Sequence, residues 1–186
     1  MKHLPCALTT LRLLLGPVAL AAALAGLSRW LYLPLLVAGT LSDIFDGILA
    51  RRLGVATPAL RRYDSITDVI YHLFILGAAW LLCRPVITQN WWLLALILLS
   101  EAAVVAVCYA KFGTYPATHS WLAKTYGLGL LAGLIALLVF DAGSWAIVAL
   151  AILALTTNTE IIAIHLCMKT APVDVKSIFA LPKSGP

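Results

Sequence analysis

Six long apolar stretches, each about as long as a bilayer is thick, constrain this chain more than any other feature. A transmembrane helix needs about 20 apolar residues, and such stretches lie at 7–28, 31–51, 60–83, 91–111, 120–140 and 144–167. Because 62% of the residues are hydrophobic and 11% are charged, a soluble domain is excluded. The sequence predicts an all-α integral membrane protein with six transmembrane helices, formed by a single domain over residues 1–170.

The distribution of basic residues predicts the orientation of these helices. Cytoplasmic loops of membrane proteins carry an excess of Lys and Arg. With a cytoplasmic N-terminus, ten Lys and Arg residues fall on the cytoplasmic side, whereas only Arg29 and Arg84 fall on the other. Arg12 lies inside the first stretch and is not counted. We therefore expect an inner-membrane protein with both termini in the cytoplasm and a cytoplasmic tail at 171–186. The net charge of +5 follows from this asymmetry, and we expect no nucleic-acid partner.

Four aspartates interrupt the apolar pattern at the ends of the second and third predicted helices. They make up half of the eight acidic residues of the chain: Asp43, Asp46, Asp64 and Asp68. We call these four side chains the carboxylate cluster. An aspartate near a helix centre in lipid costs roughly 2.5–3.5 kcal/mol on insertion scales, so the set needs a compensating partner. Ordinary interfacial partners at helix ends would explain one or two of them but explain all four poorly.

The spacing of the aspartates indicates what that partner is. The first two are three residues apart and the last two are four apart, so each pair shares one helix face. Two such pairs facing each other would form an all-oxygen site suited to Mg²⁺ or Mn²⁺. Gly47 leaves bare backbone beside the metal, and Arg51 supplies a fixed cation for a phosphate. The sequence therefore predicts a metal-dependent active site for a diphosphate substrate, at the cytoplasmic ends of helices 2 and 3.

The residues around the carboxylate cluster resemble a known motif. The segment reads Asp43-x2-Asp46-Gly47-x2-Ala50-Arg51-x8-Leu60-x3-Asp64-x3-Asp68. It is similar to the DxxDGxxARx8GxxxDxxxD signature of the CDP-alcohol phosphotransferase family, with every spacing and seven of the eight fixed residues matched. The resemblance implies a six-helix membrane enzyme, usually a homodimer. Such enzymes displace CMP from a CDP-linked group with an acceptor hydroxyl.

The resemblance also implies a role for each motif residue. The cluster as a whole would bind the metal, Mg²⁺ or Mn²⁺, and Asp68 would also act as the general base. The residues expected to contact the CDP moiety are Asp43, Gly47, Ala50, Arg51 and Thr9.

Two segments outside the motif are similar to those of bacterial phosphatidylglycerophosphate synthases. Residues 9–17 (Thr-x2-Arg-x4-Pro) resemble a first-helix pattern of those enzymes, and residues 124–125 (Lys-Thr) a fifth-helix pair. Those enzymes carry Arg-Glu in the fourth helix, where this chain has Ser100-Glu101. Other cations would then have to bind an acceptor phosphate, and the candidates are Lys124, Arg61 and Lys111.

The resemblance implies an enzyme of phospholipid synthesis that transfers a substituted phosphate group. The phosphatidyl group of CDP-diacylglycerol would pass to a small alcohol, with glycerol 3-phosphate as the first choice and CMP as the product. Serine or inositol phosphate as acceptor, and a CDP-aminoalcohol donor with diacylglycerol as acceptor, remain open. From another class, a cation or proton transporter also remains open, because carboxylates inside membranes mark ion paths. A transporter would favour acids near the bilayer midplane, without arginine beside them.

Leu60 is the one departure from the family motif, which has glycine at this position. Relatives often have phenylalanine before that glycine, whereas this chain has Ala59. One interpretation is that Phe-Gly has become Ala-Leu, so that the large side chain has moved to the neighbouring position and the local volume is similar. Alternatively, the glycine is needed for close approach to the nucleotide, and Leu60 weakens binding or makes the chain an inactive family member.

Overall fold

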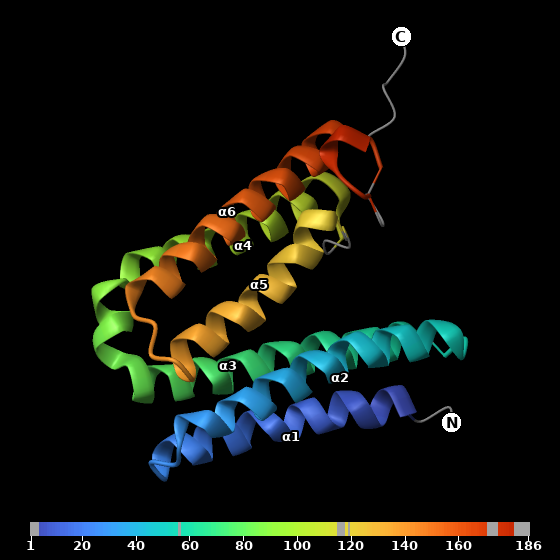
Figure 1. Cartoon of the computed structure of the whole chain (residues 1–186). Helices are drawn as coiled ribbons and strands as arrows, with labels where there is room; N and C mark the ends of the chain where they lie inside the picture. Colours follow the sequence, from blue (N-terminus) through green and yellow to red (C-terminus); the bar gives the residue numbers. More distant parts are fainter. Residues whose placement is uncertain (1–3, 56, 115–117, 119, 171–174, 181–186) are drawn as a thin grey trace. The chain divides into compact units, whose positions relative to one another are not determined.

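A computed structural model describes residues 4–55, 57–114, 118, 120–170 and 175–180. These residues form helices and no strand: α1 (Leu4–Leu24), η1 (Arg29–Leu31), α2 (Tyr32–Arg52), α3 (Pro58–Gln89), α4 (Trp91–Phe112), α5 (Trp121–Leu138), α6 (Ser144–Cys167) and η2 (Ile178–Ala180) (Figure 1). Within this part of the chain, six helices are long and apolar enough to cross a membrane. The predicted all-α fold with six candidate spans is confirmed.

The first helix ends earlier than its apolar pattern predicts. The pattern continues to residue 28, but α1 stops at Leu24. Gly26 adopts a left-handed conformation with φ of 64°, and the N–H of Leu27 donates to the carbonyl of Ala22 at 3.0 Å. A glycine in this conformation is a common helix terminator because it lacks the Cβ that would clash.

The third helix is interrupted where the third apolar stretch ends. That stretch ends at residue 83, just before Arg84-Pro85, and α3 continues beyond this point to Gln89 only across a kink. Proline lacks the N–H of the helical hydrogen bond, and its ring crowds the preceding turn. Accordingly, Cys83 departs from helical geometry, with φ of −126° and ψ of 27°. The proline therefore produces a kink inside α3.

The start of α3 has a clear local cause. Thr57 precedes the helix, and its Oγ1 accepts the N–H of Leu60 at 3.2 Å, which is the bond made by an N-cap residue. Proline follows at the first helical position, where its missing N–H has no consequence. This cap fixes the first turn of the helix that carries Asp64 and Asp68.

The chain divides into two compact units, each of which is described by itself. The first comprises Met1–Val86 with Leu134–Ala142, and in it α1 packs along α2. The buried Tyr32 hydroxyl donates to the carbonyl of Ala19 at 2.8 Å. Glycines let α3 approach closely: a Cβ on Gly39 of α2 would lie 2.7 Å from Cζ of Tyr71.

The second unit comprises Ile87–Gly133 with Gly143–Pro186, and in it α4 packs along α6. Two amide-to-hydroxyl bonds join these helices: Asn90 Nδ2 donates to Ser144 Oγ at 2.8 Å, and Asn158 Nδ2 to Ser100 Oγ at 2.9 Å. From the tail, Ser177 Oγ donates to Glu160 of α6 at 2.9 Å. These polar contacts fix α6 to its neighbours along its length.

Many large apolar side chains are exposed in each unit. Leu14, Val69, Leu73, Leu98 and Leu99 are all more than half exposed. Such a surface would be costly in water but suits helices whose outer faces contact lipid.

Candidate active site

Arg12 of α1 lies among the four aspartates of the carboxylate cluster, inside the first unit. Its Nη1 atom pairs with Asp43 and Asp68, and its Nη2 atom pairs with Asp64. Nη2 also lies 3.1 Å from Oδ2 of Asp46. A single guanidinium therefore contacts carboxylates from both α2 and α3. The two aspartate pairs predicted to face each other do meet.

The cluster is closed on one side and open on the other. The Asp46 side chain is only 5% exposed, whereas those of Asp43, Asp64 and Asp68 are 48%, 34% and 38% exposed. The buried Thr9 hydroxyl, one turn before Arg12, donates to Oδ2 of Asp46 at 3.0 Å. Asp46 is therefore held by a residue of α1, while the other three carboxylates are accessible to a ligand.

The donor set fits a divalent cation with oxygen ligands. Asp43, Asp64 and Asp68 each offer a carboxylate oxygen, and these oxygens all lie within 4.8 Å of one another. Asp46 adds a fourth carboxylate, and one guanidinium leaves most of this negative charge uncompensated. Hard cations such as Mg²⁺ and Mn²⁺ prefer oxygen ligands of this kind. The residues present therefore fit the metal that the sequence predicts.

The last turns of α2 place the other motif residues beside the cluster. Gly47 follows Asp46 directly, and the Arg51 side chain lies against it: a Cβ on Gly47 would be 3.5 Å from Nη1 of Arg51. Ala50 is 8% exposed and faces the interior of the unit. Glycine in a helix interior is destabilising by roughly 0.5–1 kcal/mol relative to alanine, and packing does not require it here. This makes close approach of a ligand the better explanation for Gly47.

Two of the three candidate cations for an acceptor phosphate have described side-chain contacts. Lys111 donates to the carbonyl of Leu166 at 2.7 Å, and Lys124 lies over the ring of Trp121 at 5.2 Å. Both lysines belong to the second unit. The Arg61 side chain is outside the described residues. Their role toward an acceptor stays a prediction.

Arg12 is the site residue to which the sequence analysis assigned no role. Spacing along one helix shows which of its residues share a face, but it does not show which distant helix contacts that face. A signal was nevertheless present, since an ionisable residue inside a span marks a functional site by default. Tyr71 was missed as well: its hydroxyl is buried, has no hydrogen-bond partner among the described residues, and lies against Gly39.

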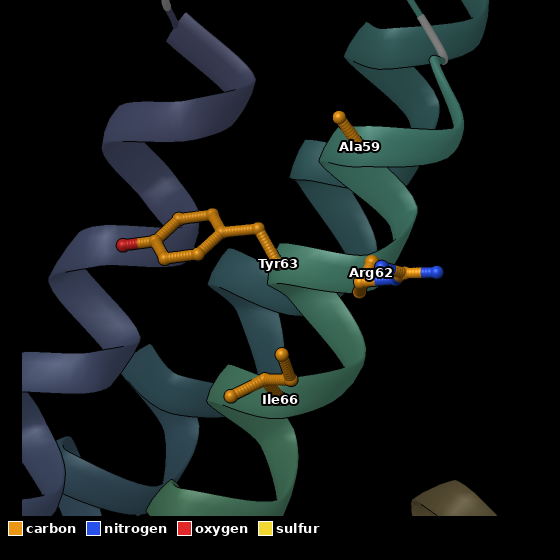
Figure 2. Close-up of a pocket in the computed structure, with 4 residues that line it drawn as sticks. All are labelled: Ala59, Arg62, Tyr63 and Ile66. Carbon is orange, nitrogen blue, oxygen red and sulfur yellow. The ribbon is translucent and has the colours of Figure 1, made fainter.

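A pocket of about 480 Å³ lies on the neighbouring face of α3. Its described lining residues are Ala59, Arg62, Tyr63 and Ile66, and none of them belongs to the carboxylate cluster. Figure 2 shows Tyr63 reaching toward α1, where its hydroxyl lies 2.9 Å from Oγ1 of Thr10, while Arg62 points away. Because the chemically suited groups lie in the cluster, we place the candidate active site there and not in this pocket.

Comparison with known proteins identifies the family. The family model described as CDP-alcohol phosphatidyltransferase matches residues 2–159. The chain belongs to this family. The four aspartates of the motif that carries the resemblance form the carboxylate cluster of the structure. No solved structure matches the chain.

Two curated proteins are similar to this chain over a substantial part of its sequence. Both are described as probable phosphatidylglycerophosphate synthase, from two strains of Mycobacterium tuberculosis, CDC 1551 / Oshkosh and ATCC 25618 / H37Rv. Each is 30% identical over 137 residues, which cover 70% of this chain and 64% of the relative. The chain therefore spans somewhat less than two thirds of the length of these relatives.

Leu60, where the family motif has glycine, provides a first test of the site. Leu60 is half-buried in the capped first turn of α3, one turn before Asp64. If bulk has been exchanged with Ala59, Leu60→Gly should change the KM for the CDP-linked substrate by less than about threefold, or ~0.7 kcal/mol. Leu60→Ala serves as the control for lost volume. A KM that falls markedly in the glycine variant alone would show that Leu60 obstructs the nucleotide.

Proposed function

We propose that this chain is a metal-dependent phospholipid synthase that transfers the phosphatidyl group of CDP-diacylglycerol to a small alcohol and releases CMP. One observation carries the proposal: in a member of this family, four carboxylates from α2 and α3 converge, and three of them offer oxygens within 4.8 Å of one another. A transporter is not favoured, because the four carboxylates are motif residues in a chain that belongs to a transferase family.

Each residue of the site has a separate proposed role in binding the metal or the substrate. Asp43, Asp46, Asp64 and Asp68 would hold Mg²⁺ or Mn²⁺. When bound, this ion would neutralise the diphosphate and the charge that develops on departing CMP. Gly47 and Ala50 would lie against the CDP moiety, and the Arg51 guanidinium would pair with its phosphates. Thr9 would support the nucleotide side of the site through its hydrogen bond to Asp46.

Asp68 is proposed as the general base of the transfer step. Its carboxylate would take the proton of the acceptor hydroxyl, whose oxygen attacks the phosphorus that carries diacylglycerol. A new P–O bond forms to the acceptor, and the P–O bond to CMP breaks, so that CMP leaves with the bridging oxygen and its electron pair. Asp68 is 38% exposed, which leaves its carboxylate open to a small alcohol. A positioned base typically contributes 10²–10⁴-fold to rate.

Glycerol 3-phosphate is the proposed acceptor, and phosphatidylglycerophosphate the product. The support is that the two mycobacterial relatives, each 30% identical to this chain, are described as probable phosphatidylglycerophosphate synthases. Lys124, Arg61 and Lys111 are the proposed partners of the acceptor phosphate. Serine, inositol phosphate and a CDP-aminoalcohol donor are the alternatives.

The proposed setting is the inner membrane, with the cluster and both termini on the cytoplasmic side and two copies of the chain forming a homodimer. The asymmetry of ten basic residues against two supports the orientation. In this setting, the acyl chains of CDP-diacylglycerol would stay in the inner leaflet while its CDP group reaches the cluster.

Release of CMP tests the proposed function directly. Purified protein in lipid nanodiscs is incubated with labelled CDP-diacylglycerol and separately with glycerol 3-phosphate, serine, inositol phosphate and inositol, with Mg²⁺ or with chelator. We expect CMP and phosphatidylglycerophosphate to form only with Mg²⁺ and glycerol 3-phosphate. Transfer to another alcohol would replace the acceptor alone, whereas CMP formation at the same rate in chelator would refute the metal-dependent mechanism.

A further inference from the structure

The guanidinium of Arg12 and a divalent cation would need the same oxygen atoms. Three of the ion pairs of Arg12 run to Asp43, Asp64 and Asp68. These are the three residues whose oxygens lie close enough together to hold a metal ion. Two cations in contact with one set of oxygens repel each other strongly. The guanidinium and the metal therefore cannot both occupy the middle of the cluster.

Outside its two terminal nitrogens, the Arg12 guanidinium lacks the hydrogen bond that would be expected if its ion pairs were purely structural. Its Nε atom is buried and has no hydrogen-bond partner among the described residues. Buried polar atoms are satisfied in the great majority of cases. All hydrogen bonds described for the guanidinium are made by its two terminal nitrogens, and all of them end on the cluster. The position of the guanidinium thus depends on the carboxylates alone.

We infer that Arg12 is an exchangeable counter-ion: it neutralises the cluster while metal is absent and leaves its centre when a divalent cation binds. This inference rests on the metal site of the proposed function. Without either cation, four carboxylates would face one another beside an apolar membrane core, which is unfavourable. Once released, the guanidinium lies at the edge of the site, and its planar array of donors suits a phosphate oxygen of the substrate.

Exchange predicts opposite effects of one substitution on two affinities. In Arg12→Gln the metal no longer displaces an internal cation, so Mn²⁺ should bind about tenfold more tightly than in the wild type. With Mn²⁺ saturating, CDP should bind about tenfold more weakly, because its phosphates lose a cationic partner. Arg12→Lys should bind Mn²⁺ with intermediate affinity, since an ammonium is a single point charge that cannot span four carboxylates.

Both affinities can be measured without turnover on the full-length protein in nanodiscs. Free Mn²⁺ is counted by electron paramagnetic resonance, and CDP binding is measured by calorimetry at saturating Mn²⁺. Arg29→Gln is the matched control, because Arg29 forms an ion pair with Asp141 at 2.8 Å and lies in η1, before the start of α2. This control should leave both affinities unchanged.

The outcomes distinguish failure of the proposed exchange from failure of the proposed function. If wild type binds Mn²⁺ but Arg12→Gln binds it equally well or more weakly, Arg12 shapes the metal site and the exchange is refuted. If wild type binds no Mn²⁺, the metal-dependent function fails and the exchange fails with it. Tighter Mn²⁺ binding with unchanged CDP binding would refute the phosphate contact of the released guanidinium.

A measurement on the wild type decides the matter if the Arg12 variants do not fold. Phenylglyoxal modifies accessible guanidinium groups, and mass spectrometry of peptides reports each arginine separately. Arg12 is 1% exposed among its carboxylates, so it should be protected in chelator and become labelled several-fold faster with Mg²⁺. Arg29 supplies the internal reference. Equal protection of Arg12 in both conditions would overturn the exchange.

Discussion

Asp68→Asn should lower the rate of CMP release by about 10²–10⁴-fold, the contribution typical of a positioned general base. Asparagine has the same shape as aspartate but cannot take a proton from the acceptor hydroxyl. It keeps one oxygen that can face Arg12 or a metal ion, so the variant should fold and bind CDP measurably. Rates from labelled CDP-diacylglycerol, together with CDP affinity, separate loss of chemistry from loss of binding.

Asp141→Asn is the matched control for this prediction. Asp141 also pairs with an arginine, Arg29, at 2.8 Å in the same unit, but it lies far from Asp68 along the helices. The same chemical change there should leave turnover within about twofold, as expected for an ion pair with exposed partners. Full activity of Asp68→Asn would show that another group takes the proton.

Gly47→Ala should damage function while leaving the fold as stable as before or slightly more stable. A Cβ on Gly47 would meet Arg51 at 3.5 Å, an ordinary van der Waals distance, and alanine favours a helix interior by roughly 0.5–1 kcal/mol. The added methyl group would occupy the space where the nucleotide is proposed to meet the backbone. We expect the KM for CDP-diacylglycerol to rise about tenfold, which is ~1.4 kcal/mol.

Gly39→Ala should show the opposite behaviour. Here a Cβ would lie 2.7 Å from the ring of Tyr71, which is 4% exposed and has little room to move. Overpacking of this kind typically costs 1–3 kcal/mol, so thermal unfolding should occur at a lower temperature. Both glycine variants are measured for unfolding and for KM. A destabilised Gly47→Ala protein would indicate that Gly47 serves packing and would remove the argument for a ligand beside it.

The fold class could be predicted from the sequence because hydrophobicity acts over whole helices. Six apolar stretches gave six helices, but single residues moved their ends. Gly26 stopped α1 through its left-handed conformation, whereas Pro85 only kinked α3. A proline breaks one helical hydrogen bond, and whether the helix continues depends on the surrounding packing. Local sequence does not contain that information.

The candidate site could be predicted only as far as spacing along one helix reaches. The intervals of three and four residues placed the aspartates on shared faces, and the motif linked the two pairs. The contact with Arg12 comes from α1. The rotation of this helix against α2 and α3 is set by contacts such as the hydrogen bond from Tyr32 to Ala19 and the close approach of Phe74 to Gly16. Arg12 was visible as a charge inside a span, but its partners depended on this packing.

The two amide-to-hydroxyl bonds between α4 and α6 have a mechanical consequence. Asn90, the N-cap residue of α4, lies ten residues before Ser100, while their partners Ser144 and Asn158 are fourteen residues apart on α6. Sliding either helix by one turn would break both bonds and would leave the buried amide of Asn158 unsatisfied in an apolar interior, where such a group costs several kcal/mol. Helices α4 and α6 should therefore resist sliding past each other. They should tilt together as one rigid body when the lateral pressure or thickness of the surrounding bilayer changes.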